Sequence, residues 1–151
     1  MSARIESSTG HAFNRPTASV QLAHVFGLEL DGMACASFVS CSGLSARREV
    51  FEFHEGGHDG VRRLQGDTLW SPLVLERGTT QNGDLFHWFQ KGDARDGAIL
   101  LLSSSGDELV RWEFTHAWPT RWEGPTLDAR HSTVALERLE LVHEGVRWIA
   151  R

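Results

Sequence analysis

The residues most able to do chemistry stand together at 54–58, where His54, Glu55 and His58 match the metallopeptidase string H-E-x-x-H. In such enzymes a helix places both imidazoles on one face to bind zinc, and the glutamate is the general base. Here the two residues between them are both glycine, and each costs about 1 kcal/mol in a helix. The residues before the string alternate like a strand, and an Asp-Gly turn signal follows it. The sequence therefore favours a glycine loop, with a zinc hydrolase as an alternative.

A second chemical feature is the tryptophan content, six residues in a chain without tyrosine. Trp112, Trp118 and Trp122 follow one another closely, and a sugar-binding β-sandwich would need such rings exposed and coplanar. Core and interface packing also use tryptophan, because it buries a large area. Packing is the favoured interpretation, and sugar binding is the alternative. The sequence predicts no catalytic residue, no cofactor and no metal.

The elements that must position these residues are mostly strands. Apolar and polar residues alternate along much of the chain, which is typical of half-buried strands. Asp31-Gly32 is a strong turn signal, and Pro72 marks an edge or a bulge. Pro119 and Pro125 break up a connection at 118–125. The expected strands are 20–30, 34–40, 47–55, 61–64, 69–77, 98–103 and 108–118.

One short helix is expected between these strands. Asn82 can cap its start, Asp84 lies in its first turn and Gly92 ends it. Leu85, Trp88 and Phe89 follow helical spacing. The segment 133–144 is ambiguous, because its composition leans slightly to helix while its apolar residues can also be paired as in a strand.

Length and composition bound the architecture. The 151 residues suffice for one core, and the strand pattern predicts an antiparallel β-sandwich or barrel with one helix. We expect a flexible arm at 1–19 and one domain at 20–151. No apolar run suits a membrane span or a secretory leader, so a protein made in the cytoplasm is expected. The net charge of −5 argues against a nucleic-acid-coating surface.

The two cysteines also fit a protein made in the cytoplasm. In one extended strand Cys35 and Cys41 would lie about 20 Å apart. A disulfide needs Cα atoms within about 7 Å, so the two cannot pair unless the chain reverses between them. Two reduced thiols are the plain interpretation.

A series of short motifs, in order along about 22–148, resembles one known family. Each motif is weak alone, and the ordered series is specific. The motifs are 26–32 (FGLELDG), 38–44 (FVSCSGL), 52–57 (EFHEGG), 75–78 (LERG), 112–114 (WEF), 117–119 (AWP), 122–125 (WEGP) and 135–145 (ALERLELVHEG). The chain is similar to the phage tail tube proteins of contractile-tail phages, including the inner tube proteins of phage-tail-like contractile injection systems.

This resemblance implies a mainly β, sandwich-like subunit, six copies of which close into a ring. Rings stack into a tube inside a sheath, in a phage tail or in a particle that can be released outside the cell. The implied partners are further copies, the sheath protein, baseplate, spike and cap proteins, and protein effectors or DNA in the lumen. The runner-up is a tube paralogue at the baseplate, which joins spike to tube.

The resemblance also bears on particular segments. It implies that the ambiguous segment 133–144 is a strand. It puts one loop in the contact region between rings, formed by Glu55, Gly56, Gly57, His58, Asp59 and Gly60. The most distinctive family signature falls on Trp118, Pro119, Trp122, Glu123, Gly124 and Pro125.

Overall fold

The computed structural model describes residues 26–149 except 32, 36–37 and 58. The expected arm at 1–19 and the first part of the expected strand 20–30 lie outside these residues. The described part is mainly β, with antiparallel pairing throughout and one short helix, as predicted. Its elements are β1 (Phe26–Leu30), β2 (Met33–Cys35), β3 (Phe38–Ser42), β4 (Ala46–His54), β5 (Val61–Trp70), β6 (Leu73–Gly78), α1 (Asp84–Lys91), β7 (Arg95–Leu102), β8 (Glu108–Glu123), β9 (Leu136–Val142) and β10 (Gly145–Ile149).

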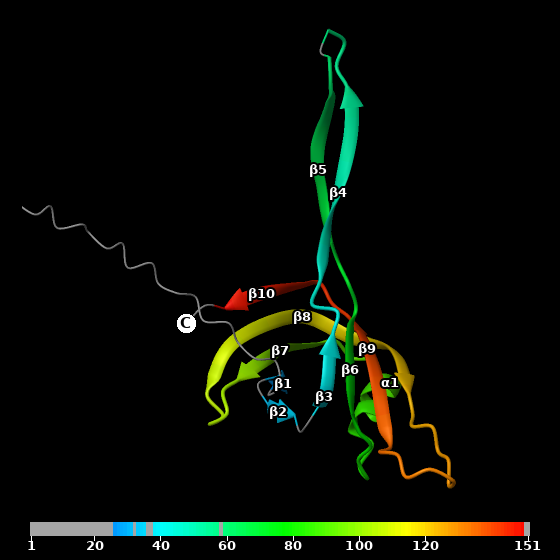
Figure 1. Ribbon diagram of the computed structural model, residues 1–151. Coiled ribbons are helices and arrows are strands. Elements are labelled where there is room, and N and C mark those ends of the chain that lie inside the picture. Colours follow the sequence, from blue (N-terminus) through cyan, green and yellow to red (C-terminus); the bar gives the residue numbers. More distant parts are fainter. Residues whose placement is uncertain (1–25, 32, 36–37, 58, 150–151) are drawn as a thin grey trace, which may run out of the picture.

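The long strand β8 belongs to two sheets and joins them. Its first half pairs with β7 on one edge and β10 on the other, and β1 and β2 continue this sheet beyond β7. Its second half pairs with β9, followed by β6 and β3. The strand turns between the sheets at His116, whose φ of 50° lies in the left-handed region. The His116 amide donates to Asp96 Oδ1 at 2.9 Å, and the two sheets curl toward each other around this corner (Figure 1).

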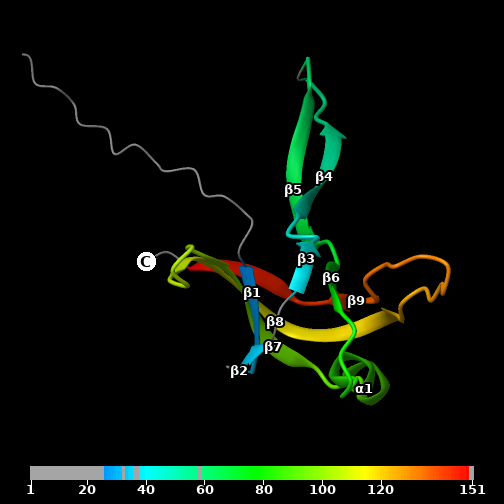
Figure 2. The ribbon, with the colours of Figure 1, turned by 60° about the horizontal axis from the view of Figure 1, so that its bottom comes forward.

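The core lies between the two curled sheets, and α1 closes one end of it (Figure 2). Leu85 and Trp88 of α1 are buried, and the Trp88 indole donates to the Asp93 carbonyl at 2.8 Å. The other buried core residues come from both sheets and are Leu28, Leu30, Phe38, Leu73, Leu75, Ile99, Phe114, Ala117, Leu139 and Leu141.

The ends of α1 confirm one prediction and correct another. Gly92 ends the helix in the left-handed region, and its amide donates to the Trp88 carbonyl, as expected. Gly83, with a φ of 59°, stands at the N-cap where Asn82 was expected. The Asn82 side chain lies one residue too early: its Oδ1 accepts a hydrogen bond from the Thr80 hydroxyl at 2.7 Å and only a long one, 3.4 Å, from the Asp84 amide.

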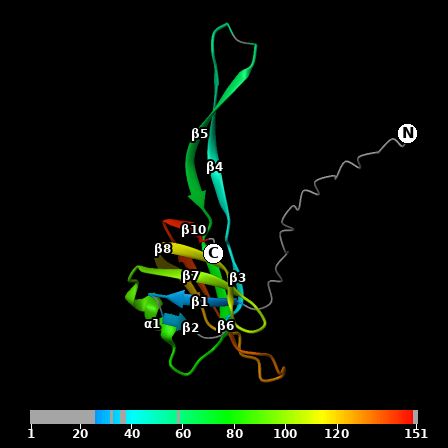
Figure 3. The ribbon, with the colours of Figure 1, turned by 90° about the vertical axis from the view of Figure 1, so that its left-hand side faces the viewer.

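Strands β4 and β5 form a separate two-stranded sheet, the hairpin. They pair from Ala46 opposite Trp70 to His54 opposite Val61. The hairpin leaves the body at its base and projects well beyond it, as Figures 1 and 3 show from two sides. At nine residues, β4 spans about 30 Å, given a rise of about 3.3 Å per residue.

Two expected strands are each divided in the structure. The expected strand 34–40 is two strands, because β2 pairs with β1, as a hairpin at Asp31-Gly32 requires, while β3 pairs with β6. The expected strand 69–77 is interrupted at Ser71 and Pro72, where the chain passes from the hairpin to the body. Pro72 has no amide hydrogen to donate to a ladder, so it suits this junction.

The second half of the chain also differs from expectation in two places. Strand β8 continues to Glu123, although the prolines were expected to end it at Trp118. Pro119 pairs with Leu141 beside a register shift, and in the described residues this half of β8 has a strand on one edge only, where proline is tolerated. The helix propensity at 133–144 is overridden, because Leu139 and Leu141 are both buried in β9; the strand implied by the family resemblance is confirmed. Strand β10 was not predicted.

Candidate functional site

The metallopeptidase string does not adopt the helical form that zinc binding needs. His54 is the last residue of β4, and residues 55–57 continue into a turn. The Glu55 carboxylate pairs with Arg62 at 3.1 Å, across the hairpin. His58 lies outside the described residues. Among the residues that are described, no three His, Cys, Asp or Glu side chains are placed to hold a metal ion.

The three tryptophans of β8 do not form an exposed platform. Trp112 and Trp122 are partly buried and pack against the core. Trp112 also meets Trp148 nearly edge-on, with ring centroids 5.2 Å apart, while Trp122 packs on Phe86 at 4.7 Å. Only Trp118 of the three is exposed. The packing interpretation fits these contacts, and a coplanar sugar platform does not.

Trp122, one of the signature residues, takes part in a buried charge network that joins α1 to the second sheet. The Trp122 indole donates to Glu137 Oε2 at 3.1 Å, and Arg77 Nε donates to Glu137 Oε1 at 3.0 Å. Arg77 also pairs with Asp84, in the first turn of α1. Arg77 and Glu137 are each only 2% exposed, so both charges depend on these partners. The motifs that contain Arg77, Trp122 and Glu137 were recognised in the sequence, but nothing in it indicated that these three side chains meet.

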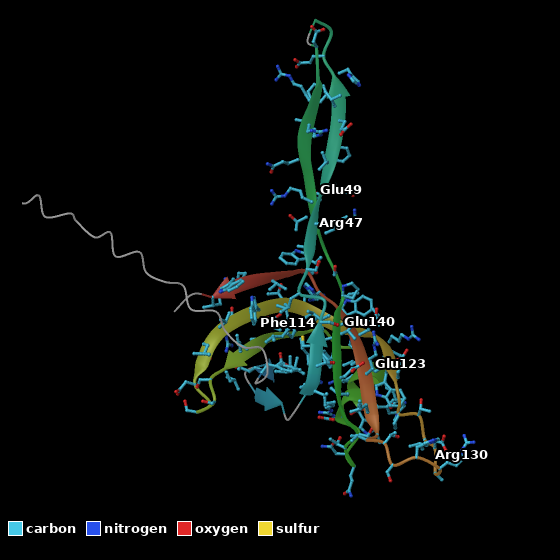
Figure 4. All side chains as sticks on the ribbon, viewed as in Figure 1. Arg47, Glu49, Phe114, Glu123, Arg130 and Glu140 are labelled. Atoms are coloured by element: carbon cyan, nitrogen blue, oxygen red, sulfur yellow. The ribbon has the colours of Figure 1, made fainter. Side chains whose placement is uncertain are left out.

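The other signature positions have varied surroundings. Trp118 is exposed, Pro119 is buried, and Glu123 pairs with Arg121 at 2.5 Å. A side chain at Gly124 would meet the Trp122 ring at 2.8 Å. Glu123 lies at the end of β8, and Figure 4 labels it there, with Arg130 at the tip of the loop that follows. These positions therefore shape one end of the body rather than a reactive site.

A second charged cluster lies on the face of the first sheet that points away from the core. Arg111 donates to Glu29 at 2.9 Å and to Glu113 at 3.0 Å, and Arg147 reaches Glu113 at 2.8 Å. These hydrogen bonds to Arg111 hold the pKa of both carboxyl groups below the usual value. Four residues from three strands are thus fixed as one ionic layer.

The hairpin exposes large apolar side chains along its length. Phe51 and Leu64 lie opposite each other and are 56% and 55% exposed, and Val50 and Val61 are also exposed. Figure 4 shows the side chains of both strands standing clear of the body, with Arg47 and Glu49 labelled near the base. A lone two-stranded hairpin is marginally stable in water, and exposed apolar patches mark interaction surfaces. The hairpin is therefore a candidate assembly surface.

The tip of the hairpin carries the loop that the resemblance puts between rings. Gly57 has a φ of 99°, which strongly favours glycine. Nothing lies within 4 Å of where side chains would begin at Gly56, Gly57 and Gly60. Glu55 is held by its pair with Arg62, and Asp59 follows His58, which the structure does not describe. The described part of the loop makes no close packing against the body.

A further apolar surface lies at the base of the hairpin, between the edges of the two sheets. It consists of two adjoining depressions of about 300 and 220 Å³ that share Leu44 and Trp112. Their other lining residues are Phe26, Val39, Ser40, Cys41, Ser45, Ala46, Trp70, Ile99, Leu101, Val146 and Trp148. We call this surface the groove. Sequence reasoning missed it because Trp148 and Val146 belong to the unpredicted β10.

Cys41 in the groove is a free thiol, and its burial raises its pKa to about 11. It is therefore a packing residue rather than a nucleophile.

These features define a class of protein, the self-assembling β subunit. Open sheet edges, a projecting apolar hairpin and an apolar groove are surfaces that association with other chains would cover. The chain belongs to the family of the T4-like virus tail tube protein gp19, whose sequence model matches residues 22–147. No curated protein sequence is significantly similar to the chain.

Solved structures with the same fold come from contractile particles. A chain of the sheath-tube complex of an extracellular contractile injection system, PVC, has a TM-score of 0.82 and 21% identity, over 89% of this chain and 95% of that one. A chain in the structure of the anti-feeding prophage cap, which terminates the tube, gives 0.83 and 20%, over 95% and 100%. A chain of the anti-feeding prophage baseplate gives 0.74 and 26%, over 87% and 97%.

Within the described residues, the one helix has eight residues and is too short to span a bilayer.

Proposed function

We propose that this chain is a structural subunit of the inner tube of a contractile injection system or contractile phage tail. Six copies close into a ring, rings stack into a hollow tube, and cargo passes through the lumen. The role is mechanical rather than catalytic. The protein acts as part of a particle that can be released from the cell.

The observation that carries this proposal is the hairpin. It exposes Phe51 and Leu64 to water, and it projects away from the body of its own subunit, which leaves these side chains uncovered. Contacts between copies would bury these side chains, and burial of a Phe or Leu side chain is worth about 1.5–3 kcal/mol. A heterologous contact of this kind, repeated by rotation or translation, builds rings and tubes. The glycine loop at the hairpin tip, including Gly56, Gly57 and Gly60, is placed between rings in this proposal.

The partners follow from the assemblies in which similar chains occur. Sheath, cap and baseplate appear beside chains of this fold, so we propose that the tube contacts a sheath protein along its length and a cap and baseplate at its ends. The acidic balance, a net charge of −5, would disfavour tight adhesion of nucleic acid in the lumen.

A second candidate is a tube paralogue next to the baseplate, which joins spike to tube. It is favoured by one observation, the 26% identity to a chain of the anti-feeding prophage baseplate. The two roles differ in copy number. A main tube protein is present in many stacked rings, whereas a baseplate paralogue is confined to one end of the particle.

The proposal is tested by the mass of the smallest closed assembly of the purified chain. Native mass spectrometry should give six copies of the 16.9-kDa chain, about 101 kDa, and multiples of it. A chain that stays monomeric at every concentration reached, and that is absent from particles purified from the same cells, would refute the proposal. Immunogold labelling of particles then separates the two roles, since a main tube protein is labelled along broken tails and a paralogue at one end.

A further inference from the structure

The direction of the hairpin is set at the junction where it leaves the body. Its strands β4 and β5 pair with each other and, within the described residues, with no other strand. Residues 43–45 on one side, and Ser71 and Pro72 on the other, connect it to β3 and β6. Because β4 spans about 30 Å, a swing of about 10° at the junction would move the tip by about 5 Å. Contacts at this junction therefore determine where the whole hairpin points.

Backbone contacts hold the two connecting segments to each other. The Ser71 amide donates to the Ser45 carbonyl at 3.0 Å, and the Ser45 amide donates to the Gly43 carbonyl at 2.7 Å. Gly43 has a φ of 92°, and a side chain there would collide with the Pro72 carbonyl oxygen. These contacts keep the two segments together, but they do not attach them to the rest of the body.

The attachment to the body is made by His143, in the turn between β9 and β10, which passes beside the base of the hairpin (Figure 1). Its Nε2 lies 3.1 Å from the Ser71 carbonyl oxygen, and the Gly145 amide donates to its Nδ1 at 3.2 Å. The ring of Trp70, the last residue of β5, lies against the imidazole, with ring centroids 5.9 Å apart. In the part of the chain that the structure describes, this is the one side-chain hydrogen bond that joins the junction to another element.

Both hydrogen bonds require the same form of the imidazole. A carbonyl oxygen can only accept, so Nε2 of His143 must carry the proton, and an amide N–H can only donate, so Nδ1 must lack one. The neutral tautomer with a protonated Nε2 satisfies Ser71 and Gly145 at once. The position therefore needs one donor and one acceptor, and not only an aromatic ring. These contacts also give a role to the end of the motif 135–145, to which His143 and Gly145 belong.

We infer that His143 is a positioning residue that locks the hairpin in one direction relative to the body. The inference goes beyond the proposed function and holds for the single subunit. A projecting arm that is already ordered loses less conformational freedom when it meets a partner, so such a lock would favour association. The competing explanation is that His143 only fills space beside Trp70.

Two variants of His143 separate a lock from a space-filling residue. His143→Leu keeps an apolar side chain but makes neither hydrogen bond, whereas His143→Gln can keep one donor and one acceptor. The direction of the hairpin is followed by double electron–electron resonance between spin labels at two exposed positions, His54→Cys near the hairpin tip and Gln90→Cys in α1. The labelled chain also carries Cys35→Ser and Cys41→Ser. It is measured at concentrations where sedimentation shows single chains, and urea unfolding gives the stability of each variant.

The parent chain should give one narrow distribution of distances between the labels. His143→Leu should broaden this distribution at least twofold, and His143→Gln should stay close to the parent width. A His143→Leu distribution as narrow as that of the parent, at whatever stability, would overturn the inference. Equal broadening in both variants would overturn it as well, because the hydrogen bonds would then not be the cause.

Nuclear magnetic resonance of the parent chain gives a second test, which depends on no variant. The nitrogen-15 shifts of His143 in mildly alkaline solution should show a protonated Nε2 and an unprotonated Nδ1. The opposite tautomer, or an average of the two, would overturn the inference. Because all these measurements are made on single chains, their failure would leave the proposed function standing.

Discussion

The buried pair of Arg77 and Glu137 offers the sharpest test of how the body is held together. We consider Arg77→Met, which keeps much of the side-chain length but removes the charge. In the variant the Glu137 carboxylate, 2% exposed, would keep only the Trp122 indole as a hydrogen-bond donor among its observed partners. Asp84, at the start of α1, would lose its contact as well.

Removing one partner of a buried ion pair costs about 3–5 kcal/mol, because the other charge is left uncompensated. A domain of this size is stable by only about 5–15 kcal/mol. With a urea m-value of about 2 kcal/mol/M, the unfolding midpoint should fall by roughly 1.5–2.5 M. The matched variant Arg77→Met with Glu137→Leu removes both charges, and it should recover at least half of the loss.

The assay is urea unfolding followed by tryptophan fluorescence, at protein concentrations where sedimentation shows monomers only. This condition matters because assembly would add to the apparent stability of the parent chain. A loss below about 1 kcal/mol for Arg77→Met, or a double variant worse than the single one, would contradict the role given to this pair.

Three further perturbations follow from the structure. Gly97→Ala would place a methyl carbon 2.4 Å from an aromatic ring of β8, and calorimetry should show a lower Tm for a loss of about 1–3 kcal/mol. Trp122→Phe keeps an aromatic ring, though a smaller one, but removes the indole donor to a buried carboxylate, and should cost about 1–3 kcal/mol in the same urea assay. Arg111→Gln should lower the Tm at pH 7, and the difference from the parent chain should close as the pH falls below 4.5. The reason is that Arg111 lowers the folded-state pKa of Glu29 and Glu113, so their stabilisation is present above the unfolded pKa and is lost as the pH falls through the folded one.

Helix ends and strand alternation could be predicted from the sequence, because each depends on residues that are close together in the chain. The Gly92 stop and the Leu85 and Trp88 stripe fixed α1, and alternation fixed β4. The N-cap was misplaced by one residue. Gly83 occupies it in a left-handed backbone conformation and without a side-chain hydrogen bond, whereas the prediction at Asn82 assumed a capping side chain. Boundaries of this kind depend on backbone geometry that composition does not encode.

The tertiary features could not be read in the same way. Strand β8 runs through Pro119 only because that half of the strand lies at an edge, and edge position is a property of the sheet. The strand at 136–142 was obtained from the family resemblance and not from propensity, since Leu139 and Leu141 are buried by distant residues. The pairing of Arg77 with Glu137, sixty residues apart, left no local trace.

The candidate site shows the same division. The glycine loop at 55–60 was found from its composition, and its described residues do lie at the tip of a projecting hairpin. Its contact with a neighbouring ring stays a prediction. The groove was missed, because it is formed by short segments such as Leu44 and Trp148 that come together only in the fold.

The most direct test of the tube role is cryo-electron microscopy of the purified chain under conditions that favour assembly, with the Phe51→Asp and Leu64→Asp double variant beside it. The parent chain should form hollow tubes of uniform width built from stacked six-membered rings, with density for the hairpin between subunits. The double variant should stay as a folded monomer or as separate rings. Parent protein that remains a monodisperse monomer with a solvated hairpin, or a double variant that forms the same tubes, would contradict the assembly role given to the hairpin.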